Sequence, residues 1–202
     1  MRSIVAFLVT ILLVSVSGPA GARCTYGVAP DGIKVQWTAF KFTSKQGVSG
    51  TFNTMKLSGP MEADTLTSLA EGLSMEIDGK SIESNNPGRN VTISEFFFQT
   101  FAPTPNITGR VESVEGDDSK GTLQIAITMN GTTRSVPFAY TISEGNAVEA
   151  TASIDMLDFA LQKSYDSIHR ACEEQHTGED GISKTWTDVD LKLTGTFTST
   201  CG

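Results

Sequence analysis

Apolar and polar side chains alternate along most of the chain after residue 23. Alternation with a period of two is typical of a β-strand that buries one face, because successive side chains point to opposite sides. Glycine and small polar residues separate the alternating runs, as expected of strands joined by turns. The runs predict eight strands, at 33–42, 48–57, 73–77, 107–111, 123–129, 132–138, 148–154 and 189–193.

The first of these runs changes phase part-way. Phe40 and Phe42 lie in the opposite phase from Trp37. One extra residue in a strand moves every later side chain to the other face, so the change predicts a β-bulge. A strand buried on both faces would give the same pattern.

The pair Asn130-Gly131 lies between two alternating runs and predicts a hairpin with a two-residue turn. Both residues of such a turn need a positive φ, which Asn and Gly adopt readily. The turn fixes the register, so that Ile125 faces Val136 and Leu123 faces Phe138. Both pairs then lie on one side of the sheet, in agreement with the hydrophobic pattern.

Two segments show helical spacing instead. In 85–101, Pro87 is placed as a first helical residue. In 157–181, an apolar stripe recurs every three or four residues; it consists of Leu161, Tyr165, Ile168 and Cys172. Eight strands with one or two helical insertions predict an all-β antiparallel fold, a barrel or a sandwich, and glycines inside strands suit a small barrel.

The first 22 residues predict a secretory signal peptide, cleaved after Ala22. Arg23 disfavours acylation of the following cysteine. The mature chain, residues 23–202, then holds 14 basic and 23 acidic residues, a formal charge of −9, after removal of Arg2. No basic cluster indicates a nucleic-acid partner, and no second apolar stretch is long enough to span a membrane. These features predict a soluble, exported single domain.

Three cysteines remain in the mature chain. In a barrel with an even number of strands, the first and last strands pair antiparallel, so that the start of the chain meets its end. Cys24 and Cys201 flank the predicted barrel, which predicts a disulfide that closes its seam and leaves Cys172 free. Closing so long a loop would stabilise the fold by roughly 4–5 kcal/mol in the chain-entropy model.

Catalytic signatures are sparse. The sequence has two histidines, no glycine-rich phosphate loop and no nucleophile elbow. The carboxylates lie mostly at outward strand positions or in loops. These features predict a protein that is not an enzyme and needs no cofactor.

One helical cluster carries metal-ligand types. His169, Cys172, Glu173 and His176 follow the spacing of one helix side, and such side chains bind zinc or copper. The plainer interpretation, which we favour, is that Cys172 packs in the apolar stripe and the histidines border solvent. The expectation is therefore no metal, with this cluster as the alternative.

Several stretches resemble the YceI-like family. They are VQWTAFKFTSKQGVSGTF (35–52), SIESNNPGRNVTISEFFF (81–98), GTLQIAITMNGTTRSVPF (121–138) and ATASIDMLDFAL (150–161). The resemblance covers about 33–197 and implies an eight-stranded, lipocalin-like antiparallel barrel that binds an isoprenoid or similar lipid in an apolar tunnel. Two features depart from the family: Asn90 stands where it often has Asp, and 169–181 has no counterpart that we can match.

The implied tunnel gives a set of candidate ligand-binding residues. Its predicted wall comprises Trp37, Phe40, Phe52, Met75, Ile93, Phe97, Leu123, Ile125, Val136, Phe138, Ile154 and Leu191. Arg89 is the candidate for a polar contact at the mouth, with a surface ion pair as the alternative. The leading function is periplasmic binding, transport or storage of a long-chain lipid. The alternatives are a filled barrel that acts as an envelope stress or interaction module, and a metal-linked accessory protein. The oligomeric state is left open between monomer and dimer.

Overall fold

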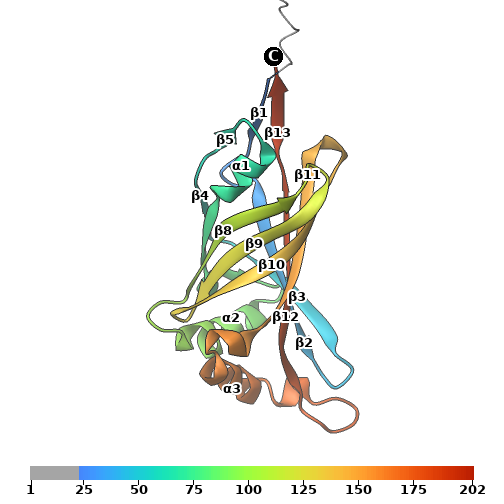
Figure 1. The fold of residues 1–202 in the computed structure, drawn as a ribbon. Coiled ribbons are helices and arrows are strands. Elements are labelled where there is room, and N and C mark those ends of the chain that lie inside the picture. Colours follow the sequence, from blue (N-terminus) through green and yellow to red (C-terminus); the bar gives the residue numbers. More distant parts are fainter. Residues whose placement is uncertain (1–22) are drawn as a thin grey trace, which may run out of the picture.

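The structure is a computed structural model, and it describes residues 23–202. The predicted signal peptide and its cleavage after Ala22 lie outside the described residues. From residue 23 onward the chain forms two antiparallel sheets with short helices at both ends of the larger one (Figure 1). The all-β antiparallel class is therefore confirmed.

The larger sheet has ten strands and is strongly curled (Figure 1). Every neighbouring pair is antiparallel. The order is β4 (Met55–Ser58), β6 (Ser74–Asp78), β8 (Asn106–Gly116), β9 (Lys120–Met129), β10 (Thr132–Ser143), β11 (Ala147–Asp155), β12 (Thr185–Thr196), β2 (Ile33–Lys41), β3 (Gln46–Phe52) and β7 (Ile82–Glu83). The chain also links the ends of this order, since β4 directly follows β3 and β7 directly follows β6.

The prediction of eight strands differs from the ten observed. The second alternating run is broken after Phe52, and its end forms the separate strand β4. The turn η1 (Gly79–Ser81) then starts the short strand β7, which pairs with β3. Asp78 caps this turn by accepting a hydrogen bond from the Lys80 amide at 2.9 Å. A strand of two residues is too short to show an alternation of apolar and polar side chains, so β7 was not predicted.

The predicted hairpin is confirmed in both turn and register. Asn130 and Gly131 have φ values of 49° and 71°. Ile125 faces Val136 and Leu123 faces Phe138 in the ladder between β9 and β10. The Asn130 side chain also joins two loops, because it accepts from the Ala102 amide at 2.9 Å and donates to the Ala160 carbonyl at 3.0 Å.

The bulge predicted in the first run is not found in β2, which pairs with β3 in continuous register from Trp37 to Lys41. Thr185 faces Lys41 whereas Val189 faces Ala39, so β12 has extra residues opposite β2 at this point. The extra residues therefore belong to β12, and beyond Trp37 both phases of β2 are partly buried. Nearby, Gly50 allows the close approach of Trp37, since a Cβ at this position would lie 2.4 Å from the indole ring.

A second, three-stranded sheet extends beyond one end of the large sheet (Figure 1). It consists of β13 (Thr198–Cys201), β1 (Cys24–Gly27) and β5 (Glu62–Ala63). Cys24 and Cys201 face each other across β1 and β13 and form the predicted disulfide, and Cys172 is free. The pairing is therefore confirmed, but the bond closes this extension rather than the seam of the large sheet.

The helix α1 (Leu66–Glu71) covers the same end and was not predicted from the sequence. Thr65 caps it, accepting from the Ser68 amide at 3.0 Å. Its buried residues join a small apolar cluster of Val28, Leu66, Leu69, Leu73 and Phe197. This cluster seals the end that carries the disulfide.

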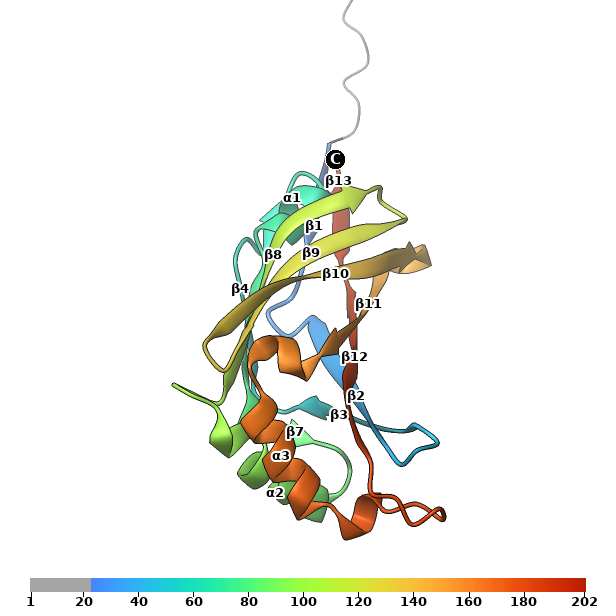
Figure 2. The same ribbon diagram turned by 60° about the horizontal axis from the view of Figure 1, so that its bottom comes forward.

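The remaining helices lie at the opposite end (Figure 2). The helix α2 (Pro87–Phe96) begins at the predicted proline after an Asn86 cap, and η2 (Phe98–Thr100) follows it. The helix α3 (Gln162–Ala171) lies between the turns η4 (Met156–Phe159) and η5 (Glu174–His176), so the second predicted helix is shorter than expected. A further turn, η3 (Glu144–Asn146), connects β10 and β11.

Candidate functional site

The curled sheet encloses a cavity of about 630 Å³. This volume lies in the range of small-molecule sites, roughly 300–1,000 Å³. Its wall is mostly apolar and comes from all ten strands of the large sheet, with α2, α3 and η5 at one end. The interior is therefore not filled by side chains, which argues against the filled-barrel alternative.

All predicted wall residues except Val136 line this cavity. They are Trp37, Phe40, Phe52, Met75, Ile93, Phe97, Leu123, Ile125, Phe138, Ile154 and Leu191. Val136 is 7% exposed and packs in the main apolar core, but it is not part of the cavity wall. Inward alternation thus identified the buried face correctly, although it could not separate core positions from cavity positions along a strand.

Four phenylalanines form an aromatic cluster at the helical end of the cavity. The ring of Phe97 lies 5.1 Å from that of Phe98 and 5.3 Å from that of Phe101, both edge-on or nearly so. Phe98 in turn lies 6.1 Å from Phe52 of β3. The cluster anchors η2 to the sheet, while Phe96, the first of the three consecutive phenylalanines, is 46% exposed.

The two ends of the cavity differ. At the disulfide end, Leu73 and Phe197 belong both to the cavity wall and to the apolar cluster that seals it. At the helical end, Asn86, Gly88 and Gln175 line the cavity and are exposed to solvent. We call the helical end, with these three residues, the mouth of the cavity.

The start of α2 at the mouth is fixed by Asn90. Its side-chain oxygen accepts from the Ser84 amide at 2.9 Å and the Ser84 hydroxyl, and its amide nitrogen donates to Glu83 at 3.2 Å. The hydrogen bond from Asn90 is the main cause of the lowered pKa of Glu83. An aspartate could not donate to Glu83, which accounts physically for Asn90 at this departure from the family pattern.

Arg89 also lines the cavity, as predicted. The surface ion pair that was its alternative interpretation is not formed. The ion pairs among residues 23–202 are Lys45–Asp188 and Lys192–Glu149.

Two histidines share one buried hydroxyl beside the mouth. Nδ1 of His169 and Nδ1 of His176 lie 3.0 Å and 2.7 Å from Oγ1 of Thr185, which is 7% exposed. A hydroxyl has one proton, so it can donate to one ring while the other ring donates to it. His169 also stacks on Tyr165 at 5.8 Å, and Tyr165 donates to the Thr185 carbonyl at 3.1 Å.

Burial and the charge of Lys41 act on this group of residues. Burial, then the charges of Lys41 and His169, lower the pKa of His176 to about 4, so its ring is neutral near pH 7. Burial raises the pKa of the Cys172 thiol, which keeps it protonated and unreactive.

The metal-binding alternative finds no support in this geometry. Both Nδ1 atoms are engaged with Thr185, and Cys172 and His176 face the apolar cavity. Within the described residues, no group of three or more His, Cys, Asp or Glu side chains is placed to hold a metal ion. The predicted apolar stripe is confirmed instead, because Leu161 and Ile168 are buried and Tyr165 packs against the core.

Several mouth residues were not identified from the sequence. Lys41, Gln175 and Trp186 line the cavity together with Arg89, and His176 does so in place of its supposed metal role. Lys41 and Gln175 come together although they are 134 positions apart, with the ammonium 3.5 Å from the Gln175 carbonyl oxygen. No local pattern links segments so distant along the chain.

The sequence was compared with known families and with curated proteins. Residues 26–198 match the model of the YceI-like domain. No curated protein sequence matches the chain significantly.

Solved structures share the fold at low sequence identity. BcnA from Burkholderia cenocepacia has a TM-score of 0.56 and 16% identity over 82% of this chain and 96% of its own. A polyisoprenoid binding domain from Saccharophagus degradans, implicated in plant cell wall breakdown, has a TM-score of 0.55 and 12% identity over 89% and 99%. The YceI protein of Campylobacter jejuni has a TM-score of 0.53 and 17% identity over 78% and 86%.

Proposed function

The chain belongs to the family of YceI-like domains, and from this membership and its apolar cavity we propose that it binds a long-chain isoprenoid or similar amphiphilic lipid. The proposed binding unit is the whole domain of residues 23–202. Its barrel-like sheet would hold the chain of the lipid, and the predicted wall residues that line the cavity would contact it. The polyisoprenoid binding domain among the structures of similar fold supports this choice of ligand.

The single observation that carries the proposal is the apolar cavity of about 630 Å³. Each buried CH₂ group contributes roughly 0.8 kcal/mol, so a chain of about twenty carbons would contribute roughly 15 kcal/mol before the costs of ordering and association. Few polar contacts are then needed for useful affinity. This supports a binding protein rather than an enzyme, in keeping with a cavity wall to which the described part of the chain contributes no Asp or Glu.

We further propose that the protein is exported and acts in the periplasm as a lipid carrier or store. The Cys24–Cys201 disulfide fits an oxidising compartment. In the described part of the chain, no helix is long and apolar enough to cross a membrane. The predicted signal peptide at residues 1–22 is consistent with this route.

Co-purification tests the proposal. Protein exported to the periplasm is extracted with organic solvent, and the extract is analysed by mass spectrometry. A stoichiometric long-chain lipid is expected from the wild type and not from Leu191→Trp, which fills the cavity from β12. Asp190→Trp introduces the same residue on the exposed side of that strand and should retain the lipid.

Repeated absence of a lipid from the wild type, together with no uptake of a prenyl probe by the delipidated protein, would defeat the proposal. Equal lipid retention by the two tryptophan variants would show that the lipid binds outside the cavity.

A further inference from the structure

The charged residues of the cavity wall all have the same sign. The chain as a whole is acidic, with 23 Asp and Glu against 15 Lys and Arg. Yet among residues 23–202 the charged side chains that line the cavity are Lys41 and Arg89, and no carboxylate is among them. The charge of the cavity wall is therefore positive, whereas the net charge of the chain is negative.

Lys41 lies at the end of β2 and lacks a carboxylate partner in the described residues. Its ammonium has a long contact with the Gln175 carbonyl oxygen at 3.5 Å, and it lies 4.4 Å above the Phe42 ring. Neither partner neutralises the charge. Its charge acts on the cavity wall, because Lys41 helps to lower the pKa of His176 and offsets part of the rise that burial causes in the pKa of Cys172.

Arg89 approaches the same end from α2. The turn η2, which follows α2, lies beside the start of α3, because Thr100 of η2 shares a hydrogen bond with Ser164 of α3. The two helices run antiparallel at the end of the sheet (Figure 2). The first turn of α2, with Arg89, therefore lies toward the end of α3 and the turn η5, where Gln175 and His176 line the cavity.

Both cations are only partly exposed. A partly buried charge gains more from a counter-ion than an exposed one does, because water screens the attraction less. The acidic residues that border the mouth in sequence, Glu83, Glu173 and Glu174, do not line the cavity, and within the described residues they form no ion pair with either cation. The two positive charges are thus left for something that enters the mouth.

We propose that the cavity selects an amphiphile with an anionic head group, a carboxylate or a phosphate, whose oxygens are held at the mouth by Lys41 and Arg89. This inference rests on the proposed lipid-binding function and adds the chemical class of the ligand. The chain of the lipid would lie along the apolar wall towards Leu73 and Phe197. The guanidinium presents a planar set of donors that matches either anion.

Three prenyl lipids with the same chain test the inference. Geranylgeraniol, geranylgeranoic acid and geranylgeranyl phosphate differ in the head group alone. We expect the two anions, or one of them, to bind the delipidated wild type about tenfold or more tightly than the alcohol, the scale of one charge-assisted hydrogen bond. The better of the two anions identifies which head group the mouth prefers.

The double variant Lys41→Gln/Arg89→Gln should lose this preference and still bind the alcohol. The matched control is Lys34→Gln/Arg110→Gln, which removes the same charges from exposed positions outside the wall and should keep the preference. Circular dichroism of both variants establishes that they are folded.

Each contrary result is separable. Equal affinity for all three lipids overturns the inference and leaves the proposed function standing. A preference for anions that persists in Lys41→Gln/Arg89→Gln, or that is lost equally in the control, overturns the assignment to these residues. Failure of all three lipids to bind refutes the proposed function itself.

Discussion

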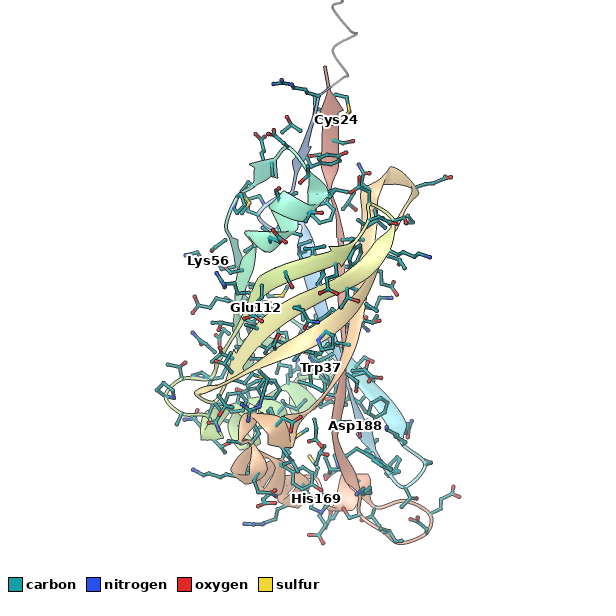
Figure 3. All side chains as sticks on the ribbon, viewed as in Figure 1. Cys24, Trp37, Lys56, Glu112, His169 and Asp188 are labelled. Atoms are coloured by element: carbon teal, nitrogen blue, oxygen red, sulfur yellow. A yellow bond between two sulfur atoms is a disulfide. The ribbon has the colours of Figure 1, made fainter. Side chains whose placement is uncertain are left out.

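The two ends of the molecule are built on different principles. At one end, a disulfide, a three-stranded sheet and the helix α1 enclose an apolar cluster in which Leu69 is fully buried. At the other, α2, α3 and η5 surround the mouth of the cavity with partly exposed polar groups. Figure 3 shows the separation, with Cys24 at one extremity and His169 towards the opposite one.

This difference indicates a division of labour between stability and binding. Covalent closure and dry packing raise the free energy of unfolding but leave no room for a ligand. A cavity leaves its lining side chains without partner atoms on one side, so that end gives up packing energy in the absence of a ligand. Changes at the sealed end should therefore act mainly on stability, and changes at the mouth mainly on binding.

The largest stability effect is expected from the disulfide. Cys24→Ala/Cys201→Ala releases a constraint between residues 177 positions apart and should lower the free energy of unfolding by about 4–5 kcal/mol in the chain-entropy model. Urea titration of the variant and the oxidised wild type measures the difference. The folded variant should bind lipid as tightly as the wild type does. A weaker affinity would show that the sealed end also contributes to binding.

Truncation of one apolar residue at each end compares the two ends directly. Leu69→Ala empties a fully buried site at the sealed end and should cost about 2–5 kcal/mol of stability with little effect on binding. Phe97→Ala removes a partly exposed ring from the cavity wall and should cost less stability but clearly weaken prenyl binding. Urea unfolding and lipid titration of both variants give the two quantities, and the reverse ranking in either would contradict the division.

A smaller, pH-dependent effect is expected at the mouth. The folded protein holds the pKa of His176 at about 4, mainly through burial, against an ordinary value of 6.5. Between pH 6.5 and pH 4 the unfolded chain takes up a proton that the folded protein does not, so stability falls as the pH is lowered through this window. Above pH 6.5 both states are neutral and the effect vanishes.

The full shift would correspond to roughly 3 kcal/mol, but the ring is only partly buried, so about 1–2 kcal/mol is expected. Free energies of unfolding of the wild type and of His176→Gln, compared at pH 7 and pH 4, isolate this contribution because all carboxylates are shared. Identical pH profiles would show that His176 is not buried as a neutral ring.

The same two ends show how far local sequence signals reach. The hairpin at Asn130-Gly131 was predicted in type and register because its turn chemistry and its alternation are both local. Eleven of the twelve wall residues named from the alternation and the family resemblance line the cavity, and the twelfth, Val136, lies in the packed core. Alternation indicates which face of a sheet is buried, but it does not show whether a position on that face contacts other side chains or an open cavity.

The sealed end and the mouth were both predicted less well. Strands β5 and β7 have two residues each, and β13 is exposed throughout, so none carries a hydrophobic pattern. The disulfide partners were correctly paired from chain ends alone, without the small sheet that joins them. At the mouth, Lys41 and Gln175 meet through tertiary packing of segments far apart, which periodicity does not record.

The central claim, that a lipid chain enters the cavity, can be tested with the protein's own fluorescence. Both tryptophans line the cavity, and Trp37 is the buried one, 7% exposed. In Trp186→Phe, emission therefore reports from Trp37 alone. Titration of the delipidated variant with geranylgeraniol should change this emission and saturate at one lipid per chain. An unchanged Trp37 signal, or one that grows with added lipid without saturating, would contradict the account.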